Sequence, residues 1–155
     1  MLKIEEGLVQ TGLMIGAGEL WFQAKPEVIW QLTEDLSDFP RIEESDGFVK
    51  IVTPIPDDER HPLDREVLER LWSIARFVAD KRVLTVCAAG QNRSGLASAL
   101  ILIARHGISG DEAIVRVQGY SGRAYSFHDT VVLWNRDFQR QLRDRFPRKD
   151  ASSAA

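Results

Sequence analysis

The stretch Val83–Ile103, VLTVCAAGQNRSGLASALILI, decides the fold that this 155-residue chain is expected to adopt. Its apolar start, VLTVC, predicts a central strand of a parallel sheet, covered on both faces. A polar turn follows, and the residues from Ser94 to His106 are nearly all apolar before Gly107, a natural helix stop. The stretch therefore predicts a strand, a tight loop and a buried helix, with Cys87, the only cysteine of the chain, where the strand ends.

Three further helices are expected around this unit. Apolar residues recur at helical spacing within residues 62–81, after the proline that would open the helix. Ser109 and Glu112 form a capping box that predicts a second helix through about Gln118. A third helix is predicted within residues 128–146, and the side chains available for its buried face are Val132, Leu133, Phe138 and Leu142.

The remaining segments predict a small sheet. Residues 48–52, FVKIV, are expected to form a strand, and residues 8–22 one or two short strands joined by glycine turns. Residues 26–32 are expected to form a short helix that opens at Pro26. Together the segments predict an α/β fold in which helices flank a small, largely parallel central sheet.

The composition is that of a soluble globular domain, with 44% hydrophobic and 28% charged residues. We expect one domain over residues 1–146 and a disordered tail over residues 147–155. No apolar run is long enough to span a membrane and no secretion signal is evident, so a cytoplasmic protein is expected. The net charge of −3 argues against a nucleic-acid partner, and one cysteine excludes both an internal disulfide and a multi-cysteine metal site.

The loop after Cys87 has the residues of an anion-binding loop. Ligands of such sheets bind at the carboxyl ends of the strands, which is where Cys87 lies. Residues 88–92 are small or tolerate turns, so their N–H groups can curl inward around an anion. Arg93, six positions after the cysteine, can hold two oxygens of a tetrahedral anion at once. The same positive surroundings favour the thiolate form of Cys87, which is the nucleophilic form of a cysteine.

Residues 87–95, CAAGQNRSG, resemble the motif of the cysteine-dependent protein tyrosine phosphatase superfamily, and the order of elements around them resembles its dual-specificity branch. The resemblance implies hydrolysis of phosphate monoesters on phosphorylated protein substrates, through a phosphocysteine and without metal or organic cofactor. It also implies that Cys87 is the nucleophile, that Arg93 holds the phosphate and that Ser94 eases departure of the thiolate. The backbone that would bind the phosphate oxygens belongs to Ala88, Ala89, Gly90, Gln91 and Asn92.

A proton donor for the leaving oxygen is expected in the segment PIPDDERHP. In the superfamily that the motif resembles, an aspartate about thirty residues before the cysteine has this role. Asp57 and Asp58 lie 30 and 29 positions before Cys87. By resemblance we assign Asp58 as the general acid, with Asp57 as the alternate. Two adjacent carboxylates repel each other, which favours the protonated form of one of them.

Val86 is one departure from the family pattern, which most often has histidine before the cysteine. It leaves open an alternative function, a phosphate-binding module that recognises a phosphorylated partner with little or no turnover. A P-loop nucleotide site is excluded because Leu96 stands where that motif needs lysine. A sulfurtransferase would leave Ser94 and the aspartate pair without a role. The natural substrate also stays open, among phosphoproteins, phosphoinositides and RNA 5′-phosphates.

Other conspicuous residues are better explained by structure than by chemistry. The three histidines, His61, His106 and His128, suit a loop, a helix end and a helix start, so none is singled out as the partner of a papain-like cysteine. The four tryptophans are scattered over four segments without a basic run between them, which favours packing over a nucleic-acid platform. Arg123 could approach the loop, but a solvated side chain is the better interpretation.

Overall fold

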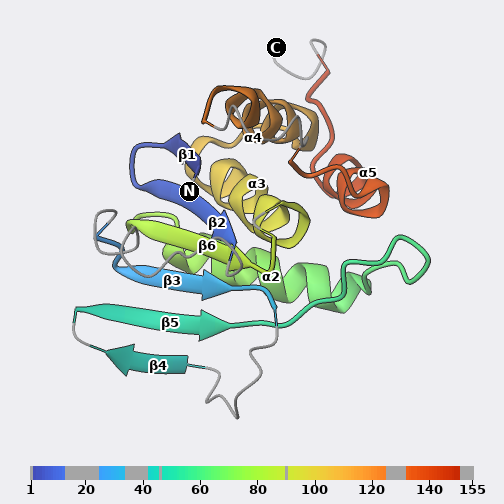
Figure 1. Cartoon of the computed structure of the whole chain (residues 1–155). Helices are drawn as coiled ribbons and strands as arrows, with labels where there is room; N and C mark the ends of the chain where they lie inside the picture. Colours follow the sequence, from blue (N-terminus) through green and yellow to red (C-terminus); the bar gives the residue numbers. More distant parts are fainter. Residues whose placement is uncertain are drawn as a thin grey trace.

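A computed structural model describes residues 2–12, 25–33, 42–45, 47–89, 91–124 and 132–150 (Figure 1). The strands of this part of the chain are β1 (Leu2–Glu5), β2 (Leu8–Gly12), β3 (Val28–Gln31), β4 (Ile42–Ser45), β5 (Phe48–Val52) and β6 (Val83–Cys87). Its helices are α2 (Arg65–Val78), α3 (Asn92–His106), α4 (Gly110–Ala124) and α5 (Arg136–Arg145).

The strands form one sheet in the order β1-β2-β6-β3-β5-β4, with β6 near its centre. Strand β6 runs parallel to both of its neighbours, β2 and β3, and β3 also runs parallel to β5. Only the edge strands β1 and β4 are antiparallel to the strand beside them. The predicted α/β fold with a small, largely parallel sheet is therefore confirmed.

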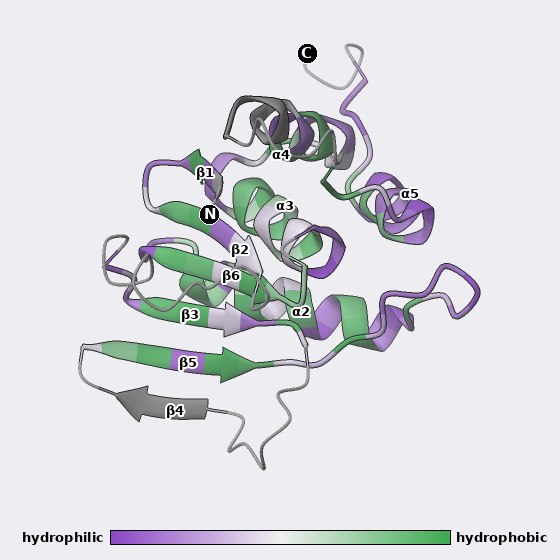
Figure 2. Cartoon of the chain, in the orientation of Figure 1, coloured by the Kyte–Doolittle hydropathy of each residue, from purple (hydrophilic) through white to green (hydrophobic). Residues whose placement is uncertain are grey.

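The described helices pack together on one face of the sheet. Helices α2 and α3 lie against each other and α4 packs on α3, with α5 beside α4 (Figure 1). Helix α3 is the centre of the core, because eleven of its fifteen residues are buried. The hydrophobic colouring in Figure 2 runs along β3, β5 and β6 and over much of α3. The predicted buried helix is confirmed, and Gly107 ends it in the left-handed conformation at φ 63°.

Strand β6 is buried along its whole length, as the apolar run VLTVC predicts. Val83 and Cys87 join the main core under the helices. Leu84 and Val86 point to the opposite face, where they pack with Ile29 in a second, smaller cluster. Because successive side chains of a strand alternate between faces, the strand buries a different set on each side.

The helix predicted over residues 26–32 is wrong, because this segment forms strand β3. Val28 and Ile29 are β-branched, and every residue of β3 is buried between β5 and β6. Two parallel neighbours satisfy the backbone hydrogen bonds of the segment on both sides, so tertiary pairing outweighs the helix signal of Pro26. Strands β1 and β4 were not predicted, and the predicted strand signal in residues 8–22 corresponds to β2.

Helix boundaries differ from the predicted ones by a few residues. Helix α2 begins at Arg65 rather than Pro62, since the N–H of Leu63 donates to the carboxylate of Asp137 at 2.9 Å instead of entering a helix. Helix α4 begins after the predicted Ser109 cap, whose hydroxyl accepts from the N–H of Glu112 at 3.2 Å, and it continues to Ala124. In α5 the buried side chains include Phe138 and Leu142, but Val132 and Leu133 lie before the helix begins.

Phe146, which follows α5, is half-buried, and its ring packs edge to face on that of Trp72 with the ring centroids 4.7 Å apart. Residues 147–150 are exposed and form neither helix nor strand, and residues 151–155 lie outside the described part, so the predicted tail stays a prediction. Of the helices in the described ranges, none is long and apolar enough to cross a membrane. The predicted glycine turns near Gly16, together with Trp21 and His128, also lie outside the described residues.

Candidate functional site

Cys87 ends strand β6 and lies directly before the turn that leads into α3. Its side chain is only 2% exposed, and its Sγ lies 3.2 Å from the Oγ of Ser94. Ser94 belongs to the first turn of α3 and is fully buried. The structure therefore brings the predicted nucleophile and the predicted hydroxyl together, because a strand and a helix separated by four residues must fold back tightly on each other.

The N-terminus of α3 faces this turn without a capping side chain. The residue at the cap position, Gln91, makes no side-chain hydrogen bond to the helix, and the first turn holds no acidic residue. The first N–H groups of a helix have no partner inside it, and together they carry a partial positive charge. An uncapped helix start of this kind suits an anion. Ala88, Ala89, Gln91 and Asn92 are described here, whereas Gly90 is outside the described residues.

Arg93 is held from two sides by segments distant in sequence. Its Nη1 donates to the hydroxyl of Thr33, after β3, at 3.1 Å and to the carbonyl of Ile55, after β5, at 3.4 Å. Its Nε is buried and has no hydrogen-bond partner among the described residues. A buried donor without an acceptor is costly, so an acceptor that reached this nitrogen would be favourable.

The structure brings Asp57, and not Asp58, to the loop. The carboxylate of Asp57 accepts hydrogen bonds from the amide of Asn92, at the start of α3, at 3.1 Å and from the amide of Asn135, at the start of α5, at 2.8 Å. Both asparagines are buried. The segment after β5 is thereby tied to the starts of α3 and α5.

Asp58 is bound to its own neighbours instead. Its carboxylate accepts from the side chain of Arg60 at 3.1 and 3.2 Å and from the Arg60 N–H at 2.9 Å, and the ring of His61 lies 2.9 Å away. The hydrogen bond from the Arg60 side chain, followed by those from its backbone and from His61, holds the pKa of Asp58 well below its usual range. These hydrogen bonds favour the ionised form of Asp58 in this conformation.

The carbonyl of Gln91 anchors the far end of the loop. It accepts the N–H of Gly95 at 3.1 Å, the N–H of Leu133 at 3.3 Å and the side-chain amide of Gln10, from β2, at 3.5 Å. Gln10 belongs to a buried polar chain beneath the loop, in which its Oε1 accepts from Ser98 at 2.9 Å and Ser98 lies 2.9 Å from Thr85. Hydrogen bonds from α3, from β2 and from the segment before α5 therefore restrain this carbonyl.

Val86 departs from the family pattern, and its side chain does not point toward the loop. The side chain packs with Ile29 and Leu84 on the other face of the sheet, and the carbonyl of Val86 accepts the N–H of Leu32 at 2.8 Å. An apolar residue suits this buried cluster. The loop is held instead by the hydrogen bonds to the carbonyl of Gln91 and by the bond between Asn92 and the carboxylate of Asp57.

Sequence reasoning missed Asn135, Gln10 and Thr33, which contact the loop or its arginine. A local signal existed only for Asn135, because an asparagine before a run of helix formers is a typical N-cap, and its Oδ1 accepts the N–H of Phe138 at 3.1 Å. Gln10 and Thr33 come from strands that meet the loop only in the folded chain. The helix that carries Arg123 is described, but its side chain is not.

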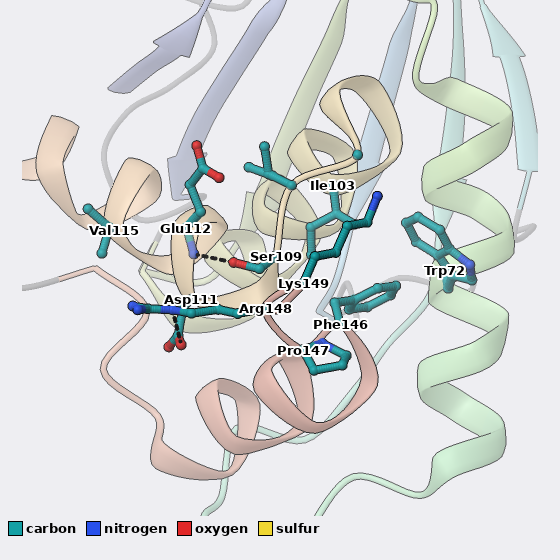
Figure 3. Close-up of a pocket in the computed structure, with 12 residues that line it drawn as sticks. Trp72, Ile103, Ser109, Asp111, Glu112, Val115, Phe146, Pro147, Arg148 and Lys149 are labelled. Atoms are coloured by element: carbon teal, nitrogen blue, oxygen red, sulfur yellow. Dashed lines mark hydrogen bonds and ion pairs between the residues drawn. The ribbon is translucent and has the colours of Figure 1, made fainter. Parts of the chain in front are cut away.

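A cavity of about 770 Å³ lies away from this loop, at the other end of α3. Figure 3 shows Ile103, near the C-terminus of α3, beside Trp72, Phe146 and the start of α4. At 1.5 Å per residue, the fifteen residues of α3 place the two ends of the helix roughly 20 Å apart. Within the described residues, no group of three or more His, Cys, Asp or Glu side chains could hold a metal ion.

Comparison with solved structures shows a known fold. Human DUSP28 matches with a TM-score of 0.67 and 18% identity, over 93% of this chain and 94% of that protein. OH1 from the Orf virus, described as a tyrosine phosphatase with triple substrate specificity, matches with a TM-score of 0.63 and 17% identity over 94% and 86% of the two chains. The human tyrosine phosphatase-like serine/threonine/tyrosine-interacting protein matches with a TM-score of 0.68 and 17% identity over 94% of each chain. This chain therefore has the fold of the dual-specificity and tyrosine phosphatases.

Sequence comparisons find no such match. No protein-family model matches the chain, and no curated protein matches it.

Proposed function

We propose that this protein is a phosphatase that hydrolyses phosphate monoesters through a phosphocysteine on Cys87. One observation carries the proposal: the Cys87 thiol meets the Ser94 hydroxyl at the uncapped start of α3, the helix that also carries Arg93, whose buried Nε has no acceptor among the described residues. A nucleophile, an anion-binding helix start and a planar cation are the groups that phosphoryl transfer requires. The likeness of the fold to phosphatases supports the same proposal.

In the first step, the thiolate of Cys87 attacks phosphorus, and the bond from phosphorus to the ester oxygen breaks. Arg93 and the N–H groups at the start of α3 bind the non-bridging oxygens, whose charge they stabilise through the transition state. The leaving oxygen takes a proton from a general acid and departs as an alcohol or a phenol. The product on the protein is a phosphocysteine.

In the second step, water attacks phosphorus and the thiolate leaves. The carboxylate that gave up its proton now takes one from the water, so the protons balance over the cycle. The Oγ of Ser94, 3.2 Å from the sulfur, donates a hydrogen bond to the departing thiolate. Inorganic phosphate is released, and the cysteine is ready for another turnover.

We assign the general acid to Asp57, the alternate of the sequence analysis, rather than to Asp58. The two amides that bind Asp57 place its carboxylate beside the start of α3, whereas Asp58 is bound and kept ionised by Arg60 and His61. A general acid must lie close to the leaving oxygen, and the contacts of Asp57 with the starts of α3 and α5 support that position for it. The substrate class that we propose is phosphorylated protein, and the location is the cytoplasm, where a lone thiol stays reduced.

The alternative is a phosphate-binding module without turnover. One neighbour in fold, the human phosphatase-like interacting protein, is not described as a phosphatase in its own name, and Val86 departs from the phosphatase motif. Cys87, Ser94 and Asp57 argue for turnover, because binding alone needs neither a nucleophile nor an acid.

Hydrolysis of an aryl phosphate at about pH 5 to 8 with a chelator present tests the proposal. We expect turnover by the parent, no turnover by Cys87→Ser, and a large loss in Arg93→Lys, which keeps the charge but not the planar fork of donors. We also expect vanadate to inhibit the parent and to raise its melting temperature, since a ligand stabilises the state that binds it.

Three other outcomes would contradict all or part of the proposed function. A folded parent that is stabilised by vanadate but shows no turnover would establish the binding module. Neither turnover nor stabilisation would overturn both functions. Turnover retained in Cys87→Ser would overturn the phosphocysteine.

A further inference from the structure

Trp134 is a large aromatic side chain left exposed beside the candidate site. It is 49% exposed, while the residues on either side of it, Leu133 and Asn135, are buried. Its indole Nε1 donates to the side-chain Oε1 of Gln91 at 3.3 Å. The Trp134 side chain therefore contacts Gln91, the residue whose carbonyl anchors the far end of the loop after Cys87.

The backbone around Trp134 is held in an unfavourable conformation. Leu133 has φ 57°, in the left-handed region that a branched side chain rarely occupies. Backbone hydrogen bonds hold it on both sides: the N–H of Leu133 donates to the carbonyl of Gln91 at 3.3 Å, and the N–H of Asn135 donates to the Oδ1 of Asn92 at 2.9 Å. The carbonyl of Leu133 accepts from the side-chain amides of Gln139 at 2.7 Å and Gln118 at 3.3 Å. In this conformation the side chains of Leu133 and Asn135 are buried, whereas that of Trp134 is partly exposed to solvent.

Gly95 lets this segment approach the start of α3. A Cβ on Gly95 would lie 3.1 Å from the Cβ of Leu133 and 3.3 Å from a methyl carbon of Val132, which is tighter than ordinary contact. The segment is thus pressed against the first turn of the helix that follows the loop. The position of Trp134 is set by packing, by backbone hydrogen bonds and by its own indole bond.

The other exposed large hydrophobic residues of the described chain lie on helices rather than beside the loop. Phe77 is on α2 and Val115 is on α4, and neither makes a hydrogen bond to the loop. Leaving an indole in water forgoes the stabilisation that burial would provide. A function in contact with a ligand is therefore a better explanation for Trp134 than a role in the core.

We infer that Trp134 is a specificity-determining contact that stacks on the aromatic ring of a phosphotyrosine and makes the site favour aryl over alkyl phosphates. The inference rests on the proposed function, because it needs a phosphate held by the loop. Gln91 lies at the cap position of α3, whose first N–H groups would bind the phosphate, and the Trp134 indole is hydrogen-bonded to its side chain. A phenyl ring offers a face for stacking, whereas the side chain of phosphoserine or phosphothreonine does not.

Turnover of two phosphopeptides with the same flanking sequence, one with phosphotyrosine and one with phosphothreonine, tests the inference. In Trp134→Ala we expect kcat/KM for the phosphotyrosine peptide to fall about threefold to tenfold, which is the range of an aromatic pair, and that for the phosphothreonine peptide to stay unchanged. Trp134→Phe keeps a ring and should retain most of the preference. Phe77→Ala, an exposed aromatic on α2, is the matched control and should change neither value.

Equal losses for both peptides in Trp134→Ala would overturn the inference and leave Trp134 as a residue that only positions Gln91. The inference would also be overturned if Trp134→Ala changed kcat/KM for neither peptide. If the parent hydrolyses p-nitrophenyl phosphate but neither peptide, the inference fails together with the proposed protein substrate, while the phosphatase activity stands. If the parent hydrolyses none of the three substrates, the proposed function fails with it.

Discussion

At the scale of single residues, two adjacent aspartates differ because they face different donors. Asp57 is bound by two buried amides that belong to helix starts, whereas Asp58 is bound by a guanidinium and an imidazole on the surface. The hydrogen bonds from Arg60, followed by that from His61, lower the pKa of Asp58, whereas the two amides tie Asp57 to the starts of α3 and α5. Adjacent positions in the sequence therefore offer different chemistry.

Exchanging each aspartate for asparagine should separate these roles. We expect Asp57→Asn to lower kcat for an aryl phosphate about a hundredfold to ten-thousandfold, the usual contribution of a general acid, with the largest loss for poor leaving groups. We expect little change in Asp58→Asn. The lowered pKa of Asp58 leaves it deprotonated from about pH 5 to 8, so its removal should not alter the pH profile of kcat/KM in that range.

Steady-state rates over that pH range, with folding checked by circular dichroism, provide the measurement. Asp58→Asn is a matched control because it makes the same change one position away. A large loss of kcat in Asp58→Asn, with Asp57→Asn active, would return the assignment to Asp58.

At the scale of elements, the start of α5 is part of the candidate site. Asn135 caps this helix through its Oδ1 and binds Asp57 through its Nδ2, so one buried side chain serves the helix and the acid-bearing segment at once. Helix α3 begins with Asn92, which binds the same carboxylate. The loop from β5 to α2 is thus attached through Asp57 to two helix N-termini, in addition to the hydrogen bonds among its own residues.

Two substitutions of Asn135 should distinguish its roles. Asn135→Ala removes both the cap and the bond to Asp57, and we expect a loss of about 1 to 3 kcal/mol in the free energy of unfolding together with a lower kcat. Asn135→Ser keeps a good capping side chain but is too short to reach Asp57 in the same way. We expect Asn135→Ser to lose kcat while it keeps more of the stability.

Urea unfolding and steady-state kinetics on the same preparations measure the two effects. If Asn135→Ser and the parent have the same kcat, the bond to Asp57 has no catalytic consequence, and Asn135 acts as a helix cap alone.

At the scale of the whole molecule, ion pairs link distant parts of the surface. Asp111, at the start of α4, binds Arg143 of α5 at 2.6 Å and Arg148 beyond it at 3.0 Å, and Glu69 of α2 binds Arg145 at 2.5 Å. Hydrogen bonds from those arginines lower the pKa of both carboxyl groups. Helix α5 and the end of the chain are therefore attached in part by charges that acid removes.

The folded protein should lose stability as the pH falls below about 4. A carboxyl group whose pKa is lower in the folded state than in the unfolded chain stabilises the fold above its unfolded pKa, here 3.8 for Asp111 and 4.5 for Glu69. That contribution is lost as the pH falls through the folded value. Because these groups are exposed, we expect each contribution to be small and to shrink at high salt.

Urea unfolding at about pH 7, 5 and 3, at low and high salt, tests this dependence. Asp111→Asn is the matched variant, and it should be less stable than the parent near neutral pH and converge with it in acid. A constant difference between the two proteins at every pH would contradict the linkage.

The fold and the core of the candidate site follow from local patterns in the sequence. The apolar run before Cys87 predicts a buried strand, the apolar segment after Ser94 predicts a buried helix, and both are confirmed. The spacing of Cys87 and Arg93 predicts that a short loop joins them. These features depend on residues within one or two turns of each other, where periodicity and chain geometry leave few alternatives.

Only the tertiary structure decides which distant residues meet that loop. The contacts of Asp57 with Asn92 and Asn135 join residues 35 and 78 positions apart, and the bond from Trp134 to Gln91 joins residues 43 positions apart. Residues 26–32 form a strand for the same reason, since β5 and β6 supply its hydrogen bonds from elsewhere in the chain. The sequence by itself determined the strand, loop and helix around Cys87, because those depend on local backbone preferences. The choice between two aspartates and the exposure of Trp134 came from the folded chain, because long-range packing and hydrogen bonding leave no periodic trace in the sequence.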